Sequence, residues 1–176
     1  DELALIGDTA GKDIHIVANL PYNVGTALLV KWMTAEKWKP WFKSLTLMFQ
    51  KEVGERIIAE PPTKTYGRLS VLCQYRADCA ILFDIPRQAF IPPPKVTSCI
   101  VQITPREESS DAPEQKTIER VVSAAFNQRR KMLRASLKGL GVDPLPKLAA
   151  AGIKETARAE ELSIDDFCRL ALEYQT

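Results

Sequence analysis

The sequence has 176 residues, of which 45% are hydrophobic and 26% charged, and its formal net charge is +2. This length allows one or two small domains with a real core, and the composition is ordinary for a soluble protein. No apolar run approaches the length of a membrane-spanning helix and no signal-peptide pattern is present, so we expect a cytoplasmic protein without a membrane partner.

The cysteines and the single histidine indicate no metal centre. The four cysteines form no C-x-x-C pair, and His15 alone cannot complete a zinc site. We therefore expect free and largely buried thiols in a reducing compartment. The cysteines are Cys73, Cys79, Cys99 and Cys168.

Strands and helices alternate over the first hundred residues. Short apolar runs predict strands at 14–18, 45–49, 80–83 and 98–103. Helical spacing predicts helices at 26–36, 51–60 and 69–75. This alternation favours an α/β fold with a mostly parallel sheet. The last two strands have no helix-length insert between them, so we expect this pair to be antiparallel.

The remainder of the chain reads as a linker followed by helices. Residues 105–115 are polar, acidic and proline-bearing, which is typical of a linker. Helices are expected at 117–126, 128–138 and 163–174, the last with Ser163 as its N-cap. We therefore predict an α/β domain at 1–104, a linker at 105–115 and a small all-α domain at 116–176.

Residues 19–22 read Asn-Leu-Pro-Tyr and directly follow the first apolar run. A strand that ends on this tetrapeptide presents an amide, a backbone carbonyl and an aromatic ring together, which suits a flat base with an exocyclic amine. That amine can donate two hydrogen bonds, one to the side-chain oxygen of Asn19 and one to a backbone carbonyl oriented by Pro21. Tyr22 can stack on the base. The alternative is an ordinary β-turn in which Tyr22 caps the core.

Phe90 belongs to a second candidate segment, FIPPPKVTS at 90–98. Its three consecutive prolines favour a stiff, extended conformation that fixes the direction of Phe90. Loops at the carboxyl ends of parallel strands gather on one edge of a sheet, where ligands bind. We therefore expect Phe90 opposite Tyr22, with a gap the size of a base between the rings. The alternative is a core phenylalanine beside a plain proline-rich linker.

The segment FNQRRKMLR at 126–134 is locally basic, because no acidic residue occurs between Glu119 and Asp143. On the expected helix, Arg130, Arg134 and Lys138 share one face at i, i+4 and i+8, apart from a leucine stripe. Such a face suits phosphate groups, although a solvated surface helix is the alternative. The candidate RNA contacts are Arg129, Arg130, Lys131, Arg134 and Lys138.

Over essentially its whole length, the chain resembles the ribosomal RNA adenine dimethyltransferases that act on the small subunit. The segments that carry the resemblance are NLPYNV at 19–24, FQKEVGERI at 49–57, YGRLSV at 66–71, QAFIPPPKVTS at 88–98 and AFNQRRKMLRASL at 125–137. Several motifs in the same order are far more specific than any one of them.

The resemblance implies the second half of a Rossmann-like class I methyltransferase sheet followed by a small all-α domain. It also implies conversion of two adjacent adenosines near the 3′ end of small-subunit ribosomal RNA to N6,N6-dimethyladenosine, with S-adenosylmethionine as methyl donor. By this resemblance Asn19 contacts both the donor and the target amine, and the Pro21 region supplies the second acceptor. Tyr22 and Phe90 then enclose the adenine.

The sequence departs from that family at its amino-terminal end. The Gly-rich donor loop and the acidic residues that hold the donor have no counterpart here, and Gly7-Asp8 does not replace them. We therefore expect a carboxyl-terminal portion, inactive alone, that keeps only Asn19 as a donor contact. The strand at 14–18 would then be an apolar edge, able to pair with a second copy or with the missing half.

Two other functions remain open at this point. A non-catalytic RNA-binding or ribosome-assembly module would use the basic segment without methyl transfer. The methyltransferases of large-subunit RNA share the turn but usually carry Ile where Leu20 stands. The FNQRRK segment favours the small-subunit group, so the expected partner is small-subunit RNA in the assembling ribosomal particle.

Overall fold

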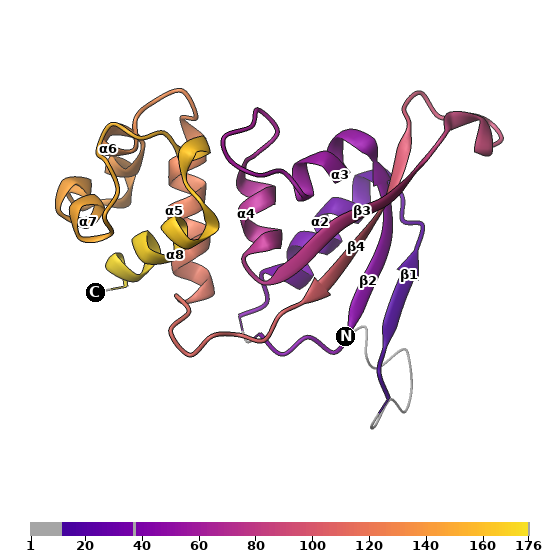
Figure 1. Ribbon diagram of the computed structural model, residues 1–176, viewed down its shortest axis with the longest axis horizontal. Coiled ribbons are helices and arrows are strands. Elements are labelled where there is room, and N and C mark those ends of the chain that lie inside the picture. Colours follow the sequence, from indigo (N-terminus) through magenta and orange to yellow (C-terminus); the bar gives the residue numbers. More distant parts are fainter. Residues whose placement is uncertain (1–11, 37, 176) are drawn as a thin grey trace.

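The computed structural model describes residues 12–36 and 38–175. Its strands form one mixed sheet in the order β1-β2-β4-β3 (Figure 1). β1 pairs parallel with β2, whereas β4 pairs antiparallel with both of its neighbours. The strands are β1 (His15–Ala18), β2 (Ser44–Gln50), β3 (Ala77–Ile85) and β4 (Ser98–Pro105).

The mixed sheet corrects one prediction and confirms another. The expectation of a mostly parallel sheet is wrong for the described strands, because β4 enters between β2 and β3. The antiparallel pairing of the last two strands is confirmed. The segment between them, residues 86–97, contains only the short 3₁₀ helix η1 (Arg87–Ala89). A parallel return would need a longer crossover, so the chain turns back beside β3.

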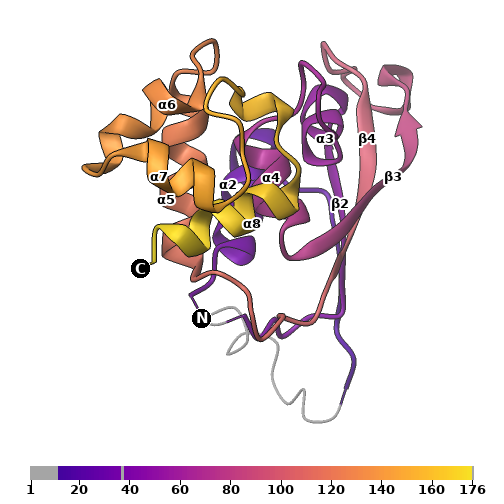
Figure 2. The same ribbon diagram turned by 60° about the vertical axis from the view of Figure 1, so that its left-hand side comes forward.

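Three helices cover one face of the sheet (Figure 2). They are α2 (Tyr22–Met33), α3 (Lys51–Ile57) and α4 (Arg68–Gln74). Leu29 and Met33 of α2 and Leu47 of β2 are fully buried in the core between these layers. On the other face, Val17 remains 78% exposed and Phe83 57% exposed within the described structure. Within the described residues, the first strand therefore buries only one of its faces.

The carboxyl-terminal region is helical. It contains α5 (Gln115–Asn127), α6 (Leu133–Ser136), α7 (Pro144–Ala150) and α8 (Ile164–Glu173), with the 3₁₀ segments η2 (Leu137–Leu140) and η3 (Ala159–Glu161). We call residues 115–175 the helical part and residues 12–105 the sheet part. Ser163 caps α8 as predicted, because its hydroxyl accepts a hydrogen bond from the Asp166 amide at 3.1 Å.

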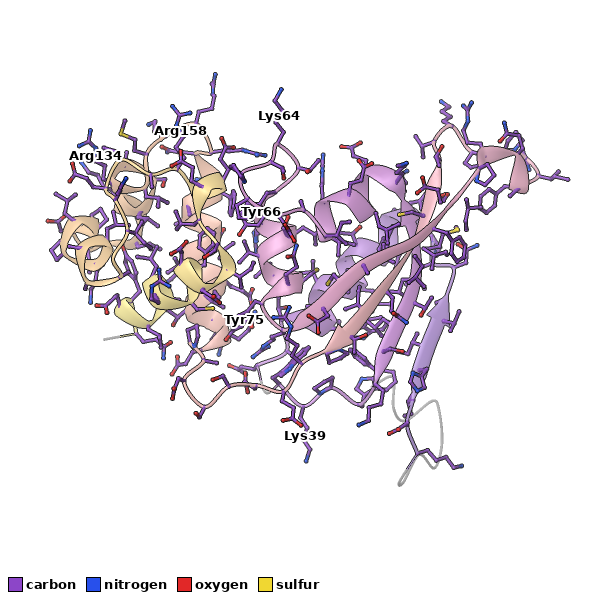
Figure 3. All side chains as sticks on the ribbon, in the orientation of Figure 1. Lys39, Lys64, Tyr66, Tyr75, Arg134 and Arg158 are labelled. Atoms are coloured by element: carbon purple, nitrogen blue, oxygen red, sulfur yellow. The ribbon has the colours of Figure 1, made fainter. Side chains whose placement is uncertain are left out.

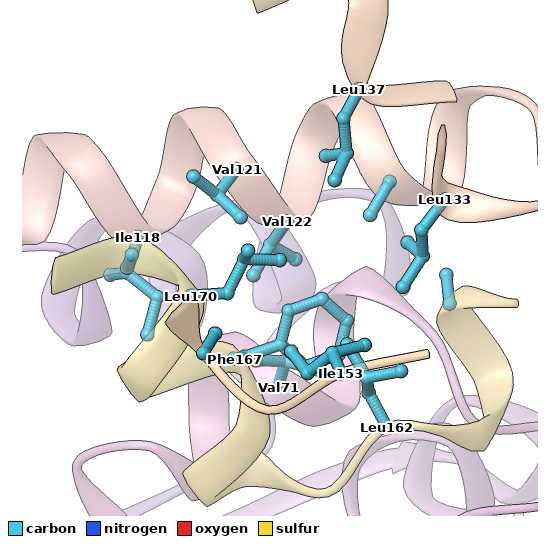
Figure 4. Close-up of a cluster of buried hydrophobic side chains, with 14 of the residues drawn as sticks. Val71, Ile118, Val121, Val122, Leu133, Leu137, Ile153, Leu162, Phe167 and Leu170 are labelled. Carbon is cyan, nitrogen blue, oxygen red and sulfur yellow. The ribbon is translucent and has the colours of Figure 1, made fainter. Parts of the chain in front are cut away.

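The core of the helical part also takes side chains from the sheet part. Figure 4 shows Val71 of α4 among side chains of α5 and α8, and Tyr66 is fully buried in the same cluster. The Tyr66 and Phe167 rings each lie close to Phe126, with centroid distances of 6.0 and 5.7 Å. The two parts therefore share one continuous hydrophobic interior at α4.

The predicted helix at 128–138 is wrong. The chain leaves α5 at Asn127, and Met132 is extended and forms an isolated bridge with Arg158. The Leu133 amide donates to the Ala157 carbonyl at 2.8 Å, so a distant segment satisfies a backbone group that a continuous helix would have used. Arg130 therefore does not share a helix face with Arg134 and Lys138.

The cysteines are free, as predicted. Cys73 and Cys99 are buried, and Cys79 and Cys168 are partly buried. Burial raises the pKa of the Cys79 thiol to about 12 and that of Cys168 to about 11. These thiols therefore remain protonated and unreactive near neutral pH.

Neither a membrane-spanning helix nor a metal-binding cluster occurs in residues 12–36 and 38–175. No helix in this range has both the length and the apolar character that crossing a membrane requires. Within the same range, His, Cys, Asp and Glu side chains nowhere gather in threes in a way that could hold a metal ion.

Candidate functional site

The Asn-Leu-Pro-Tyr segment forms the turn between β1 and α2. β1 ends at Ala18 and α2 begins at Tyr22, four residues earlier than its predicted start. Pro21 occupies the N-cap with φ −53° and ψ 136°, and its carbonyl accepts the amides of Val24 and Gly25, both at 2.9 Å. Because proline has no amide hydrogen and a fixed φ, it is well tolerated at the start of a helix, where the backbone amides have no partner within the helix.

The turn leaves two hydrogen-bond acceptors available. Asn19 is exposed, and its side chain makes no hydrogen bond within the described part of the chain. The carbonyl of Pro21 is occupied by the start of α2, whereas that of Leu20 accepts no hydrogen bond from the described residues. The unoccupied carbonyl beside Pro21 is therefore that of Leu20, which the sequence interpretation did not single out.

A shallow hollow of about 280 Å³ lies at this turn. Its lining consists of Asn19, Leu20, Pro21, Tyr22 and Met48. Met48 is 7% exposed and comes from β2, beside the end of β1. An amide, a phenol ring and an apolar side chain around one open hollow can hold a flat heterocycle whose polar edge faces Asn19.

The Phe90 segment is attached to the same edge of the sheet. The Tyr22 hydroxyl lies 2.6 Å from the hydroxyl of Ser98, the fully buried first residue of β4. Phe90 directly follows η1, is partly buried, and does not line the hollow at the turn. The structure thus brings Asn19, Pro21 and Tyr22 together and joins the base of the Phe90 segment to them through Ser98.

One cation at the end of β2 was not predicted from the sequence. Lys51 follows the end of β2; its amide donates to the Thr97 carbonyl at 2.9 Å, and its Nζ lies 2.5 Å from Asp84 Oδ2. The hydrogen bond to Asp84 raises the pKa of Lys51 above its usual range. Asp84 lies on β3, so only the folded sheet brings the two residues together.

The five predicted RNA-contact residues divide into two groups. Arg129 pairs with Glu160 at 2.8 Å and donates to the Thr63 carbonyl, while Arg134 pairs with Glu155 at 2.9 Å. The others make no ion pair within the described part of the chain and are exposed. These others are Arg130, Lys131 and Lys138.

Two more cations lie with this group, and the sequence interpretation missed both. The bridge between Met132 and Arg158 places Arg158 beside the basic turn at 128–132. The hydrogen bond from Arg129 to Thr63 brings Lys64 to the same region. Figure 3 shows Lys64, Arg134 and Arg158 projecting from one edge of the molecule. No local pattern marks either residue, because backbone contacts between distant segments bring them together.

The fold is shared with solved RNA methyltransferases. A dimethyladenosine transferase from Plasmodium falciparum superposes with a TM-score of 0.79 and 26% identity, over 97% of this chain and 70% of that chain. The 23S rRNA methyltransferase ErmE superposes with a TM-score of 0.63 and 21% identity, over 98% of this chain and 70% of that one. The second likeness bears on the fold alone.

The sequence comparisons identify the family. The family model for ribosomal RNA adenine dimethylase matches residues 4–176, so the chain belongs to that family. It is 58% identical over 161 residues to the ribosomal RNA small subunit methyltransferase A of Azorhizobium caulinodans, and 54% identical over 171 residues to that of Xanthobacter autotrophicus. These matches cover 92% and 97% of this chain but 55% and 58% of the relatives. The chain thus spans about half the length of the curated relatives it matches.

Proposed function

We propose that this chain carries the adenine-binding side of an enzyme that dimethylates N6 of two adjacent adenosines near the 3′ end of small-subunit ribosomal RNA. The observation that carries the proposal is the turn at Asn19: an unengaged side-chain amide, the free Leu20 carbonyl and the Tyr22 ring surround one hollow. Membership in the ribosomal RNA adenine dimethylase family supports the substrate class.

The proposed chemistry rests on positioning. Adenine N6 is a weak nucleophile because its lone pair is delocalised into the ring. The two N6–H groups donate hydrogen bonds to Asn19 Oδ1 and to the Leu20 carbonyl. These hydrogen bonds turn the N6 lone pair toward the methyl group. Tyr22 stacks on one face of a base taken out of its helix, and Phe90 closes on the other face. S-adenosylmethionine, when bound, supplies an electrophilic methyl group and retains the bonding electron pair on sulfur; the N6 proton leaves to solvent.

The residues at the turn fit the methyl donor only in part. Asn19 lies at the carboxyl end of β1, where a donor and an adenine can both reach its amide. The other described residues around the hollow are Leu20, Pro21, Tyr22 and Met48, which offer no charged group to a ribose or an amino acid. Among the described residues, we therefore assign only Asn19 to donor binding.

In this proposal, the predicted α/β domain at 1–104 and the predicted helical domain at 116–176 have different functions, and residues 105–115 link them. The sheet part holds the adenine, and the helical part holds the RNA backbone through Arg129, Arg130, Lys131, Arg134 and Lys138. Three of these cations have no ion-pair partner in the described structure, which leaves them available to phosphates. Because the substrate is ribosomal RNA, we place the protein in the cytoplasm, on the assembling small subunit.

The open edge of the sheet supports a further association. Among the described strands, β1 pairs only with β2, and Val17 on β1 is 78% exposed. An apolar edge strand with unpaired amides and carbonyls readily pairs with another strand. That strand belongs either to a second copy or to the additional length that the relatives carry. Light scattering that gives the mass of one chain would exclude the dimer.

An Asn19→Ala substitution in the full-length protein, as cells produce it, tests the proposal. With small ribosomal subunits that lack the two methylated adenosines, we expect loss of methyl transfer from labelled S-adenosylmethionine and nearly unchanged RNA affinity. Retained transfer would remove Asn19 from the mechanism. If the wild-type protein binds RNA but gives no calorimetric signal with S-adenosylmethionine, it is instead a non-catalytic RNA-binding module.

A further inference from the structure

Arg76 is a buried arginine at the junction of the sheet part and the helical part. It lies between α4 and β3, and its side chain is 3% exposed. A buried guanidinium is unfavourable unless its charge and its donors are paired. Its Nη1 donates to the Ala35 carbonyl at 2.6 Å, and its Nη2 pairs with Glu108 at 2.8 Å. The rings of Trp38 and Tyr75 lie 4.8 and 5.6 Å from its central carbon.

The Arg76 side chain binds the end of the helix that begins at the candidate site. Nη1 also approaches the carbonyl of Met33, the last residue of α2, at 3.4 Å. α2 starts at Tyr22 and has 12 residues. At 1.5 Å per residue it spans roughly 18 Å between the Asn-Leu-Pro-Tyr turn and Arg76. A cation at the carboxyl end of a helix is favourable because it complements the partial negative charge there.

The same guanidinium also binds the segment that connects the two parts. Glu108 belongs to residues 106–114, which lie between β4 and α5. This connector is tied to the sheet part along its length: the Arg106 amide donates to the Arg76 carbonyl at 2.8 Å, Trp38 Nε1 to the Arg106 carbonyl at 2.7 Å, and the Tyr75 hydroxyl to the Pro113 carbonyl at 2.8 Å. The connector is therefore a bound segment rather than a loose tether.

A second ion pair lies beside this junction. Lys116 in the first turn of α5 pairs with Glu36, three residues beyond α2. Its two side chains are 78% and 68% exposed, so solvent screens it and its contribution is small. Arg76 is buried and contacts both the end of α2 and the connector, so water screens its charge less than it screens that of Lys116.

We propose that Arg76 is a positioning residue: it fixes the angle of the helical part so that the basic residues around 128–134 and the Asn19 turn engage one RNA together. The inference rests on the proposed function. Arg76 touches neither RNA nor the reacting atoms and acts through α2 and Glu108. Without it, the shared core at α4 still joins the two parts, but the end of α2 and the connector lose their common charged contact. The helical part then tilts about α4, and only a fraction of the molecules present both surfaces in the arrangement that binds.

Three variants and one control test this inference in the 176-residue chain. Arg76→Met keeps the volume and removes the charge. Arg76→Lys keeps the charge but cannot span both Ala35 and Glu108. Glu108→Gln removes the negative charge from the connector contact and leaves Arg76 in place, at a side chain that is 40% exposed, and so keeps the test valid if Arg76→Met fails to fold. The control is Arg106→Met, because Arg106 pairs with Asp78 in the open, with the side chains 50% and 72% exposed.

The first measurement is the distance distribution between non-cysteine spin labels at the exposed residues Gln102 and Ala149. We expect a narrow distribution for the wild type and Arg106→Met, and a broad one for Arg76→Met and Glu108→Gln, with Arg76→Lys between them. A narrow distribution in variants that remain folded would overturn the role of Arg76, whatever the chain binds.

The second measurement is affinity for a short small-subunit RNA hairpin with two adjacent adenosines. If the competent fraction falls to roughly a tenth, the apparent affinity falls about tenfold, since it scales with that fraction. We expect this decrease in Arg76→Met, partial recovery in Arg76→Lys and no decrease in Arg106→Met. Broadened distances with unchanged affinity would overturn the link to RNA. A wild-type chain without RNA affinity would contradict the proposed function, while the distances still decide whether Arg76 fixes the angle.

Discussion

The hydroxyl groups of Tyr22 and Ser98 lie 2.6 Å apart, and this contact joins the Asn-Leu-Pro-Tyr turn to the strand that follows the Phe90 segment. Ser98 is fully buried, so water does not replace Tyr22 as its partner. The hydrogen bond holds the Tyr22 ring beside the hollow. Two sequence segments that are 76 residues apart are thereby fixed relative to one another.

Two substitutions of Tyr22 distinguish the contribution of its ring from that of its hydroxyl. Tyr22→Phe keeps the ring and leaves the Ser98 hydroxyl without this partner, so we expect a decrease of about 1 kcal/mol in the free energy of unfolding. Methyl transfer should be nearly unchanged. Tyr22→Ala also removes the stacking surface, worth roughly 1–3 kcal/mol per base, so transfer should fall about 5- to 150-fold. Urea denaturation and labelled-methyl assays measure the two effects; an equal decrease of transfer in both variants would argue against stacking.

The unpaired lysines of the helical part should dominate the salt dependence of RNA binding. Replacing Lys131 and Lys138 with Gln removes two cations that have no ion-pair partner in the described structure. The slope of log affinity against log salt should fall by about one for each lysine that binds a phosphate in the wild type. Lys39→Gln is the control, since Lys39 projects from the opposite edge of the molecule (Figure 3). An unchanged slope in the double variant, measured by fluorescence anisotropy, would place the RNA elsewhere.

Gly54 in α3 should not tolerate a side chain. A Cβ at this position would lie 2.3 Å from Cys99 Sγ and 3.2 Å from Val101 Cγ2, both in the core under the helix. We expect Gly54→Ala to lower the free energy of unfolding by about 1–3 kcal/mol, which is typical of overpacking. Gly139→Ala is the matched control, because nothing lies within 4 Å of its Cβ. Similar thermal midpoints for the two variants would contradict the close packing at α3.

The cap of α8 should make stability depend on pH. Burial opposes the charge of Asp166, but hydrogen bonds from Ser163 and Arg169 outweigh it and hold the pKa of Asp166 below its ordinary 3.8. A depressed pKa stabilises the fold above the unfolded-state value, and this stabilisation disappears as pH falls through the folded-state value. Ser163→Ala should therefore cost about 1 kcal/mol at pH 7 and less at pH 3. An equal cost at both values, measured by urea unfolding, would exclude Asp166 from the cap.

Local chemistry predicts those features that depend on neighbouring residues. The turn at 19–22, the cap at Ser163 and the antiparallel return before Ser98 could each be found from the sequence, because proline, capping groups and loop length act over a few residues. The helix at 128–138 could not, since the amide of Leu133 pairs with Ala157 and only the tertiary fold reveals this. Lys64, Arg158 and Arg76 were missed for the same reason.

The shared interior at α4 limits how this chain can be divided for experiments. Tyr66 and Val71 lie in the sheet part by sequence, yet they fill the same hydrophobic cluster as Phe167 and Leu170 of α8. A recombinant fragment that started at the acidic connector would expose the surface these two side chains normally occupy. Expression of the carboxyl-terminal helices alone should therefore yield aggregating material, and a soluble fragment needs Tyr66 and α4 at its amino-terminal end.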